Sequence, residues 1–182
     1  MKMNIQEIYQ ETIKYATLKH QENRQTIPDS DLPYVVHLSN VAMELFISYI
    51  NSADFDLQYA MQVALLHDVL EDTSTMLQEL DAEFGKEIAE GVLALTKNDH
   101  LLKEEKVPDS LMRIKLLRKE VWAVKLADRI TNLQKPPVSW DNEKKARYLN
   151  ESVLILDELT GGNFYLENRL KEKIEMYKEY IE

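Results

Sequence analysis

Four short segments of this 182-residue chain carry side chains of the kinds that hold a divalent metal ion. They supply two imidazoles and several carboxylates, and in chain order they are His37, His67-Asp68, Glu71-Asp72 and Asp128. Such a mixed nitrogen and oxygen set suits Mn²⁺, Fe²⁺, Co²⁺ or Zn²⁺ and leaves positions for water and a phosphate oxygen. The pattern favours a metal-dependent phosphohydrolase, in which the ion lowers the pKa of its bound water and offsets phosphate charge.

The middle segment lies at the end of a stretch, 60–72, that is apolar almost all round up to His67. A helix with that pattern is normally buried on most sides. Burying an imidazole and several carboxylates is unfavourable unless they are paired or bound to a cation. If the helix continues, Glu71-Asp72 stacks one turn beyond His67-Asp68. Either Glu71 or Asp72 is then placed to orient the water or to move a proton, and the sequence leaves the two roles unassigned.

Asp128 belongs to a second apolar stretch, 121–133, in which the polar residues form a narrow stripe. Asp128 and Asn132 lie one turn apart on that stripe, as residues spaced by four do on a helix. His37 is also surrounded by apolar neighbours, in the segment 34–38. Three separate segments therefore predict buried polar groups that need a common partner.

Each segment taken alone has a simpler explanation. A lone His37 is more often a satisfied core histidine, Glu71-Asp72 could begin an exposed loop, and Asp128 could pair with Arg129 on a helix surface. The joint pattern is far less expected by chance. A non-catalytic nucleotide-binding module and a plain helical interaction protein stay open as alternatives, the first disfavoured by the presence of both Glu71 and Asp72.

The elements that must position these residues are predicted to be helices, because the chain has only 4 Gly and 5 Pro and no alternating strand pattern. We expect one all-α domain, a helical bundle over residues 1–182. Loops are expected at 23–32 and 100–109. Helices are expected over 5–21, 33–50, a stretch capped by Asp54 or Asp56 and ending near 72, one capped by Thr73 or Ser74 and ending at 84, 87–96, 110–133, 140–159 and 163–181.

The net charge of −10 and the pI of about 5.0 argue against a nucleic-acid partner and against a polybasic membrane-binding surface. The absence of cysteine excludes disulfides, thiolate metal sites and cysteine nucleophiles. The start of the chain has no apolar signal segment, and no run approaches the roughly 20 apolar residues that span a bilayer. We expect a cytoplasmic protein whose partner is a small nucleotide. The sequence does not predict its oligomeric state.

With these motifs in place, the sequence resembles the HD-superfamily hydrolase domain of the RelA/SpoT enzymes, from about Ile5 to the region of Tyr148. The match is carried by His37, by the HDxxED element at 67–72 and by the ADRxxN element at 127–132. The length leaves no room for synthetase or regulatory domains, so the chain is similar to the small stand-alone alarmone hydrolases. The resemblance implies an HD-type bundle and Mn²⁺-dependent removal of pyrophosphate from the 3′ position of ppGpp or pppGpp, giving GDP or GTP.

The resemblance also implies roles for individual residues. The metal would be held by His37, His67, Asp68 and Asp128, and Glu71 and Asp72 would be the catalytic carboxylates. Substrate contacts would come from Arg24 at the base or phosphate edge, Asn132 at the ribose or phosphates, and Tyr148.

Three departures from the family pattern lie near the expected base site rather than the metal. Gln25 stands where a basic residue usually follows the arginine, the segment 26–32 replaces a shorter turn that contains Gly, and Leu38 stands where Pro commonly follows the metal histidine. A nucleotide phosphohydrolase with a different base preference is therefore the alternative within the same chemistry.

Overall fold

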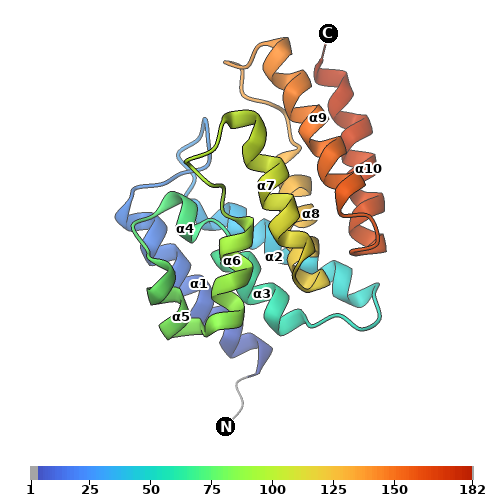
Figure 1. Cartoon of the computed structure of the whole chain (residues 1–182). Helices are drawn as coiled ribbons and strands as arrows, with labels where there is room; N and C mark the ends of the chain where they lie inside the picture. Colours follow the sequence, from blue (N-terminus) through green and yellow to red (C-terminus); the bar gives the residue numbers. More distant parts are fainter. Residues whose placement is uncertain (1–3, 182) are drawn as a thin grey trace.

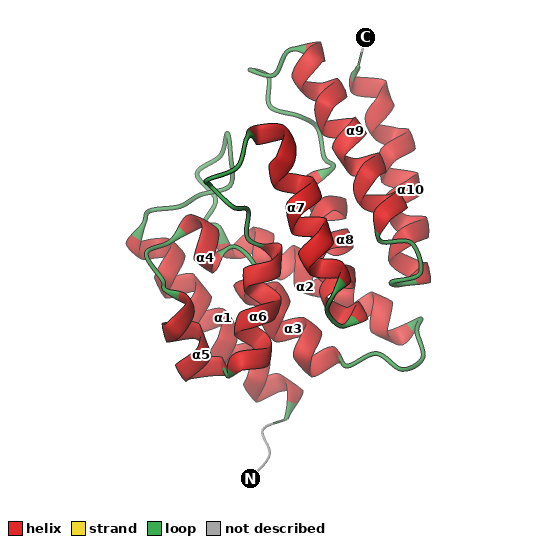
Figure 2. Cartoon of the chain, in the orientation of Figure 1, coloured by secondary structure: helices red, strands yellow, loops and turns green. Residues whose placement is uncertain are grey.

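The structure, a computed structural model, describes residues 4–181, and helices make up the regular structure of that range (Figure 2). The all-α prediction is confirmed. The helices are α1 Ile5–Glu22, α2 Val35–Ile50, α3 Leu57–Leu66, α4 Val69–Asp72, α5 Leu77–Phe84, α6 Lys86–Leu95, α7 Lys103–Lys115, α8 Lys119–Asn132, α9 Asn142–Glu158 and α10 Phe164–Tyr177, followed by a 3₁₀ turn Lys178–Tyr180.

Helices α3 and α8 form the centre of the bundle (Figure 1). Every residue from Glu120 to Thr131 on α8 is buried, and so are seven of the ten residues of α3. Helix α2 packs against both, α1 covers α3, and α10 covers another side of α8. The enclosure of both helices explains why α3 is apolar almost all round and why the polar residues of α8 are confined to a narrow stripe, because burial removes the need for a solvated face.

The helix predicted to run to residue 72 is broken at the doublet His67-Asp68, so that prediction is wrong at its most important point. Asp68 has φ −103° and ψ −1°, which ends α3 and starts the single turn of α4. The His67 ring bonds the Ala64 carbonyl, three residues back, and so occupies a backbone acceptor at the end of the helix. The doublet therefore sits in a turn rather than on a helix flank.

The predicted loop at 100–109 is also wrong, because α7 begins at Lys103. Glu105 accepts a bond from the backbone N–H of Leu102 and so caps the first turn, where acidic side chains are favourable. Pro108 is tolerated inside the helix, whose buried residues Val107, Ser110, Leu111 and Ile114 keep helical spacing. Polarity concealed this helix, since most of its surface faces solvent.

The single helix predicted over 110–133 is divided between Lys115 and Lys119. Arg118, with ψ 150°, turns its guanidinium toward three carboxylates, those of Asp56, Glu87 and Glu120, at 2.9–3.2 Å. Asp56 and Glu87 come from other parts of the chain, so the break depends on tertiary contacts that a local pattern does not contain.

Of the proposed caps, Asp56 is confirmed: its side chain accepts from the backbone N–H of Tyr59 at 3.1 Å. The Thr73 or Ser74 cap is wrong, because α5 starts at Leu77 and the Thr73 hydroxyl instead donates to the Val69 carbonyl.

Among residues 4–181, no helix has the length and apolarity required to cross a membrane.

Candidate functional site

Three buried side chains from different parts of the bundle converge on one point. His37 comes from α2, His67 from the end of α3 and Asp128 from α8. His37 Nε2 lies 3.3 Å from His67 Nε2 and 3.4 Å from Asp128 Oδ1, and His67 Nε2 lies 3.6 Å from the same oxygen. The donor atoms of all three lie within 4.8 Å of one another, close enough to share a metal ion. Two imidazoles and a carboxylate form a donor set that fits a divalent transition metal.

The surrounding contacts fix how these side chains point. His67 Nδ1 donates to the Ala64 carbonyl at 2.7 Å, which leaves the lone pair of Nε2 for the cluster. Asp128 accepts from Lys125 Nζ at 3.2 Å and from Asn132 Nδ2 at 2.6 Å, both on α8. Hydrogen bonds of this kind hold metal ligands in position in proteins.

Asp68 lies beside the cluster but is less enclosed, with its side chain 20% exposed. Its Oδ2 is 2.9 Å from His67 Nε2 and 3.8 Å from His37 Nε2, and it also accepts a hydrogen bond from the Tyr34 hydroxyl. Ligation of the metal by Asp68 therefore stays a prediction with favourable geometry. From its sequence position, Tyr34 is only an apolar neighbour of His37 in the segment 34–38, and no role was predicted for it.

The cluster shifts the pKa values of its members in opposite directions. Burial works to lower the pKa of His67, but the charges and hydrogen bonds of Asp68 and Asp128 outweigh it and raise that pKa well above its usual range. Burial likewise works to raise the pKa values of Asp68 and Asp128, yet both fall below their usual range, mainly through His67 and Lys125 respectively. The carboxylates thus strongly favour a cation in their midst, a proton or a metal ion.

Glu71 and Asp72 lie on α4, directly after the doublet, and each is held by a different part of the chain. Lys97 binds both oxygens of Glu71, through Nζ at 2.6 Å and through its backbone N–H at 3.0 Å. Gln25 Nε2 donates to Asp72 Oδ2 at 2.7 Å. Burial and the nearby charge of Asp68 raise the pKa of Asp72.

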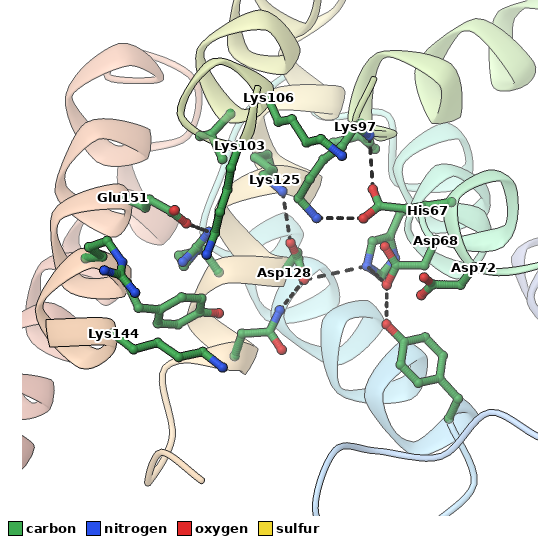
Figure 3. A pocket seen from close by; sticks show the side chains of 18 of the residues that line it. His67, Asp68, Asp72, Lys97, Lys103, Lys106, Lys125, Asp128, Lys144 and Glu151 are labelled. Atoms are coloured by element: carbon green, nitrogen blue, oxygen red, sulfur yellow. Dashed lines mark hydrogen bonds and ion pairs between the residues drawn. The ribbon is translucent and has the colours of Figure 1, made fainter. Parts of the chain in front are cut away.

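A cavity of about 370 Å³ opens from the cluster (Figure 3). Its walls include Asp68, Glu71, Asp72 and Asp128. Although the whole chain is acidic, basic residues outnumber acidic ones in this lining; they are Lys97, Lys103, Lys106, Lys125, Arg129, Lys144 and Arg147. Local positive charge in an acidic protein favours an anionic ligand.

Four of these residues form what we call the basic rim: Lys103 and Lys106 on α7, and Lys144 and Arg147 on α9. In Figure 3, Lys103 and Lys144 lie toward the opposite end of the cavity from Asp72. The rim was not predicted from the sequence. Each pair is three residues apart and so shares a helix face, but exposed basic residues at this spacing are common and do not by themselves indicate a site.

The three predicted substrate contacts are placed differently. Asn132 and Tyr148 line the cavity, and Tyr148 is stacked under the Arg129 guanidinium at 4.2 Å from the ring centre. Burial raises the pKa of the Tyr148 hydroxyl to about 12, so it stays protonated. Arg24 is exposed and does not line the cavity, and a contact between it and substrate stays a prediction.

An all-helical bundle that buries two imidazoles and a carboxylate beside a basic cavity has the donor set and the local charge that a metal-dependent phosphohydrolase requires. The chain belongs to the HD domain family, whose model matches residues 12–159.

Relatives of known name cover most of the chain. It is 29% identical over 168 residues to guanosine-3′,5′-bis(diphosphate) 3′-pyrophosphohydrolase MESH1 of Drosophila melanogaster, covering 90% of this chain and 91% of that protein. With the Homo sapiens protein of the same name it shares 31% identity, covering 88% and 89%. The GTP pyrophosphokinase rsh of Brucella melitensis is 32% identical over 173 residues, which is 92% of this chain but 22% of that protein. The chain is therefore an enzyme of the RelA/SpoT-like hydrolase type.

Comparison with solved structures also finds proteins of the same fold. A structure described as a metazoan ortholog of SpoT that hydrolyzes ppGpp superposes with a TM-score of 0.78 at 28% identity, covering 93% of this chain and 94% of that chain. The structure of lmo0812 from Listeria monocytogenes has a TM-score of 0.64 at 22% identity, covering 80% and 97%, and supports the fold alone. The HD-type bundle predicted from the sequence is confirmed.

Proposed function

We propose that this chain removes pyrophosphate from the 3′ position of ppGpp or pppGpp in a Mn²⁺-dependent hydrolysis that gives GDP or GTP. The observation that carries the proposal is that the cluster of His37, His67 and Asp128 borders a basic cavity whose lining includes Glu71 and Asp72. We propose this substrate because the relatives are named as ppGpp 3′-pyrophosphohydrolases. The reaction consumes one water molecule for each pyrophosphate released.

The proposed metal site has His37, His67 and Asp128 as ligands, with Asp68 as the fourth. When bound there, Mn²⁺ would lower the pKa of a water molecule and offset charge on the 3′-phosphates. The hydrogen bond from His67 to the Ala64 carbonyl keeps its other nitrogen free for the ion, so the ligand needs no rearrangement before binding.

The carboxylates of α4 supply proton transfer. Lys97 restricts Glu71 to one orientation by binding both of its oxygens, and Gln25 restricts Asp72. Two oriented carboxylates beside the metal can take a proton from the attacking water and return one to the leaving oxygen. Asn132, Tyr148 and the basic rim are left to bind the ribose and the remaining phosphates, because they line the rest of the cavity.

A second candidate is hydrolysis of a nucleotide with another base by the same chemistry. One observation favours it: the side chains expected near the base do not face the cavity. Arg24 lies outside the lining, and Gln25 is hydrogen-bonded to Asp72 and His20.

The experiment that tests the proposal is product analysis with Mn²⁺ present, with ppGpp offered beside GDP, GTP, ATP and NADPH. Release of GDP and pyrophosphate from ppGpp alone would support the proposed reaction. Turnover of another nucleotide instead would replace the substrate but keep the mechanism. Binding of Mn²⁺ without turnover of any of them would overturn catalysis and favour a regulatory nucleotide-binding domain.

A further inference from the structure

A chain of hydrogen bonds leads from Asp72 away from the cavity. Gln25 Nε2 donates to Asp72 Oδ2 at 2.7 Å, and the other end of the same amide, Oε1, lies 2.5 Å from Nδ1 of His20. Within residues 4–181, the bond from Gln25 is the side-chain hydrogen bond that orients Asp72. None of these contacts involves the metal ligands.

The chemistry of the groups fixes the position of one proton. An amide oxygen only accepts, so Nδ1 of His20 must carry the hydrogen. The ring is 2% exposed, and its Nε2 is buried without a hydrogen-bond partner in the described part of the chain. Burial also lowers the pKa of His20, which keeps the ring neutral. His20 is therefore a neutral donor of defined tautomer, directed at Gln25.

The turn after α1 places Gln25 for this contact. The backbone N–H of Gln25 bonds the carbonyl of His20 at 3.0 Å, and that of Arg24 bonds the carbonyl of Gln21 at 2.9 Å. This is the bonding of a Schellman motif, with Arg24 in the left-handed conformation at φ +53°. Main chain and side chain of Gln25 are thus both fixed by His20.

The same turn makes a second contact with α4. Asn23 Nδ2 donates to the backbone carbonyl of Asp72 at 3.2 Å. The turn therefore holds both the main chain and the carboxylate of Asp72, through Asn23 and Gln25 respectively. The bond from Asn23 is sufficient to hold the main chain of α4 against the turn. The bond from Gln25 acts on the carboxylate of Asp72 alone.

We propose that Gln25 is a positioning residue that orients the Asp72 carboxylate in the cavity, and that His20 fixes the Gln25 amide so that its N–H₂ end faces Asp72. The inference rests on the proposed function, because it presumes that Asp72 takes part in proton transfer. An amide holds the carboxylate without neutralising it, whereas a cation at the same position would form an ion pair with it.

The first test reads the hydrogen-bond chain without any turnover. Nitrogen-15 NMR of the histidine rings distinguishes a proton on Nδ1 from one on Nε2. We expect His20 to be the Nδ1–H tautomer in the unmodified protein and to lose that preference in Gln25→Leu. A proton on Nε2 in the unmodified protein would overturn the inference, whatever the enzyme hydrolyses.

The second test measures kcat and KM for ppGpp with Mn²⁺. We expect Gln25→Leu to lower kcat about 10-fold, with KM within about 2-fold of the parent, because a misaligned group reduces the chemical step. Mn²⁺ affinity, measured by calorimetry, is expected to stay the same. The exposed neighbour Gln21, changed to Leu, is the matched control and should keep the parental kcat.

His20 provides a rescue experiment. His20→Leu removes the donor and should lower kcat in the same direction as Gln25→Leu, whereas His20→Asn restores a donor near the position of Nδ1 and should recover most of it. Parental kcat in Gln25→Leu, or a loss confined to KM, would overturn the positioning role. No turnover by the unmodified protein would instead overturn the proposed function, a result that the tautomer measurement keeps separate from the hydrogen-bond chain.

Discussion

The two ends of the cavity are held in opposite ways. At the metal end, His37 is 6% and His67 3% exposed, and their donor atoms face one another across three segments of the bundle core. At the basic rim, Lys103, Lys144 and Arg147 are exposed. Within residues 4–181, neither Lys103 nor Lys144 forms an ion pair with a carboxylate.

This difference leads us to assign the chemical step to the metal end of the cavity and substrate affinity to the basic rim. The metal end is fixed by packing and hydrogen bonds that do not depend on what is bound. The rim consists of long side chains on the surface, and it can change without disturbing the core. Lys106 pairs with Asp99 and Arg147 with Glu143, whereas the charges of Lys103 and Lys144 have no carboxylate partner within residues 4–181. We therefore expect substitutions at the metal end to abolish the reaction, and substitutions at the rim to change affinity.

The largest effect is expected from Asp128→Asn. Loss of the carboxylate should lower metal affinity by about 10²-fold or more and remove turnover with it, because Asp128 joins both imidazoles and Lys125. Metal binding by calorimetry and ppGpp hydrolysis measure the two losses. Asp81→Asn on the exposed face of α5 is the control. Metal affinity equal to that of the parent would show that Asp128 is not a ligand.

Glu71→Gln should retain the metal but lower kcat about 10²- to 10⁴-fold, the usual contribution of a general acid or base. The amide keeps the size of the side chain and one acceptor for Lys97. Single-turnover kinetics with saturating Mn²⁺ measures the chemical step, and Glu11→Gln on α1 is the exposed control. Parental turnover would remove Glu71 from the mechanism.

Removing the metal should reduce stability by a smaller amount. An ion that binds only the folded state contributes about 2.7 kcal/mol at a free concentration of about 100 Kd. For a chain of this length, EDTA should then lower Tm by about 5–10 °C. Thermal unfolding with and without Mn²⁺ measures the shift. Asp128→Asn should show no such shift, and an equal shift in both proteins would contradict the assigned site.

At the rim, Lys144→Ala should raise KM for ppGpp about 3- to 10-fold with little change in kcat, since one exposed charge on a phosphate is worth about 1 kcal/mol. The salt dependence of KM should weaken as well. Lys86→Ala is the matched control, because Lys86 pairs with Glu90 on α6 and does not line the cavity. A loss confined to kcat would mean that the rim takes part in the chemistry.

The smallest effect is expected from Arg24→Gly. Relief of the left-handed conformation at φ +53° favours glycine, and the entropy of the unfolded chain opposes it. The free energy of unfolding should rise by no more than about 1 kcal/mol, as measured by urea denaturation. The same variant tests the predicted substrate contact, because an unchanged KM for ppGpp would exclude Arg24 from the binding site.

The metal end was predictable from the sequence because polar residues on apolar helices stand out. That contrast indicates His37, His67 and Asp128 as metal-binding candidates, and the family resemblance implies these three and Asp68 as ligands. The structure brings the donor atoms of the first three together. Burial makes each such position informative, since a buried charge requires a partner. The turn at 67–68 and the hydrogen bond from His67 to the Ala64 carbonyl were not predictable. The apolar pattern continues past the point where α3 ends, so it does not mark the break.

The rim was not predictable for the opposite reason. Exposed lysines are common on any helix, so Lys103 and Lys144 carry no signal until the cavity between α7 and α9 is known. The break near Arg118 depends on carboxylates that are distant in the sequence. The contact between Gln25 and Asp72 likewise joins α4 to a turn far earlier in the chain.

The placement of the three buried donors on α2, at the end of α3 and on α8 has a consequence for synthesis. As the chain leaves the ribosome, His37 and His67 emerge well before Asp128 does. The metal centre cannot close until α8 has followed, and half of the basic rim, on α9, is made later still. An ion held by these three donors therefore links the first half of the nascent chain to the second half, and it can do so only after α8 has been synthesised.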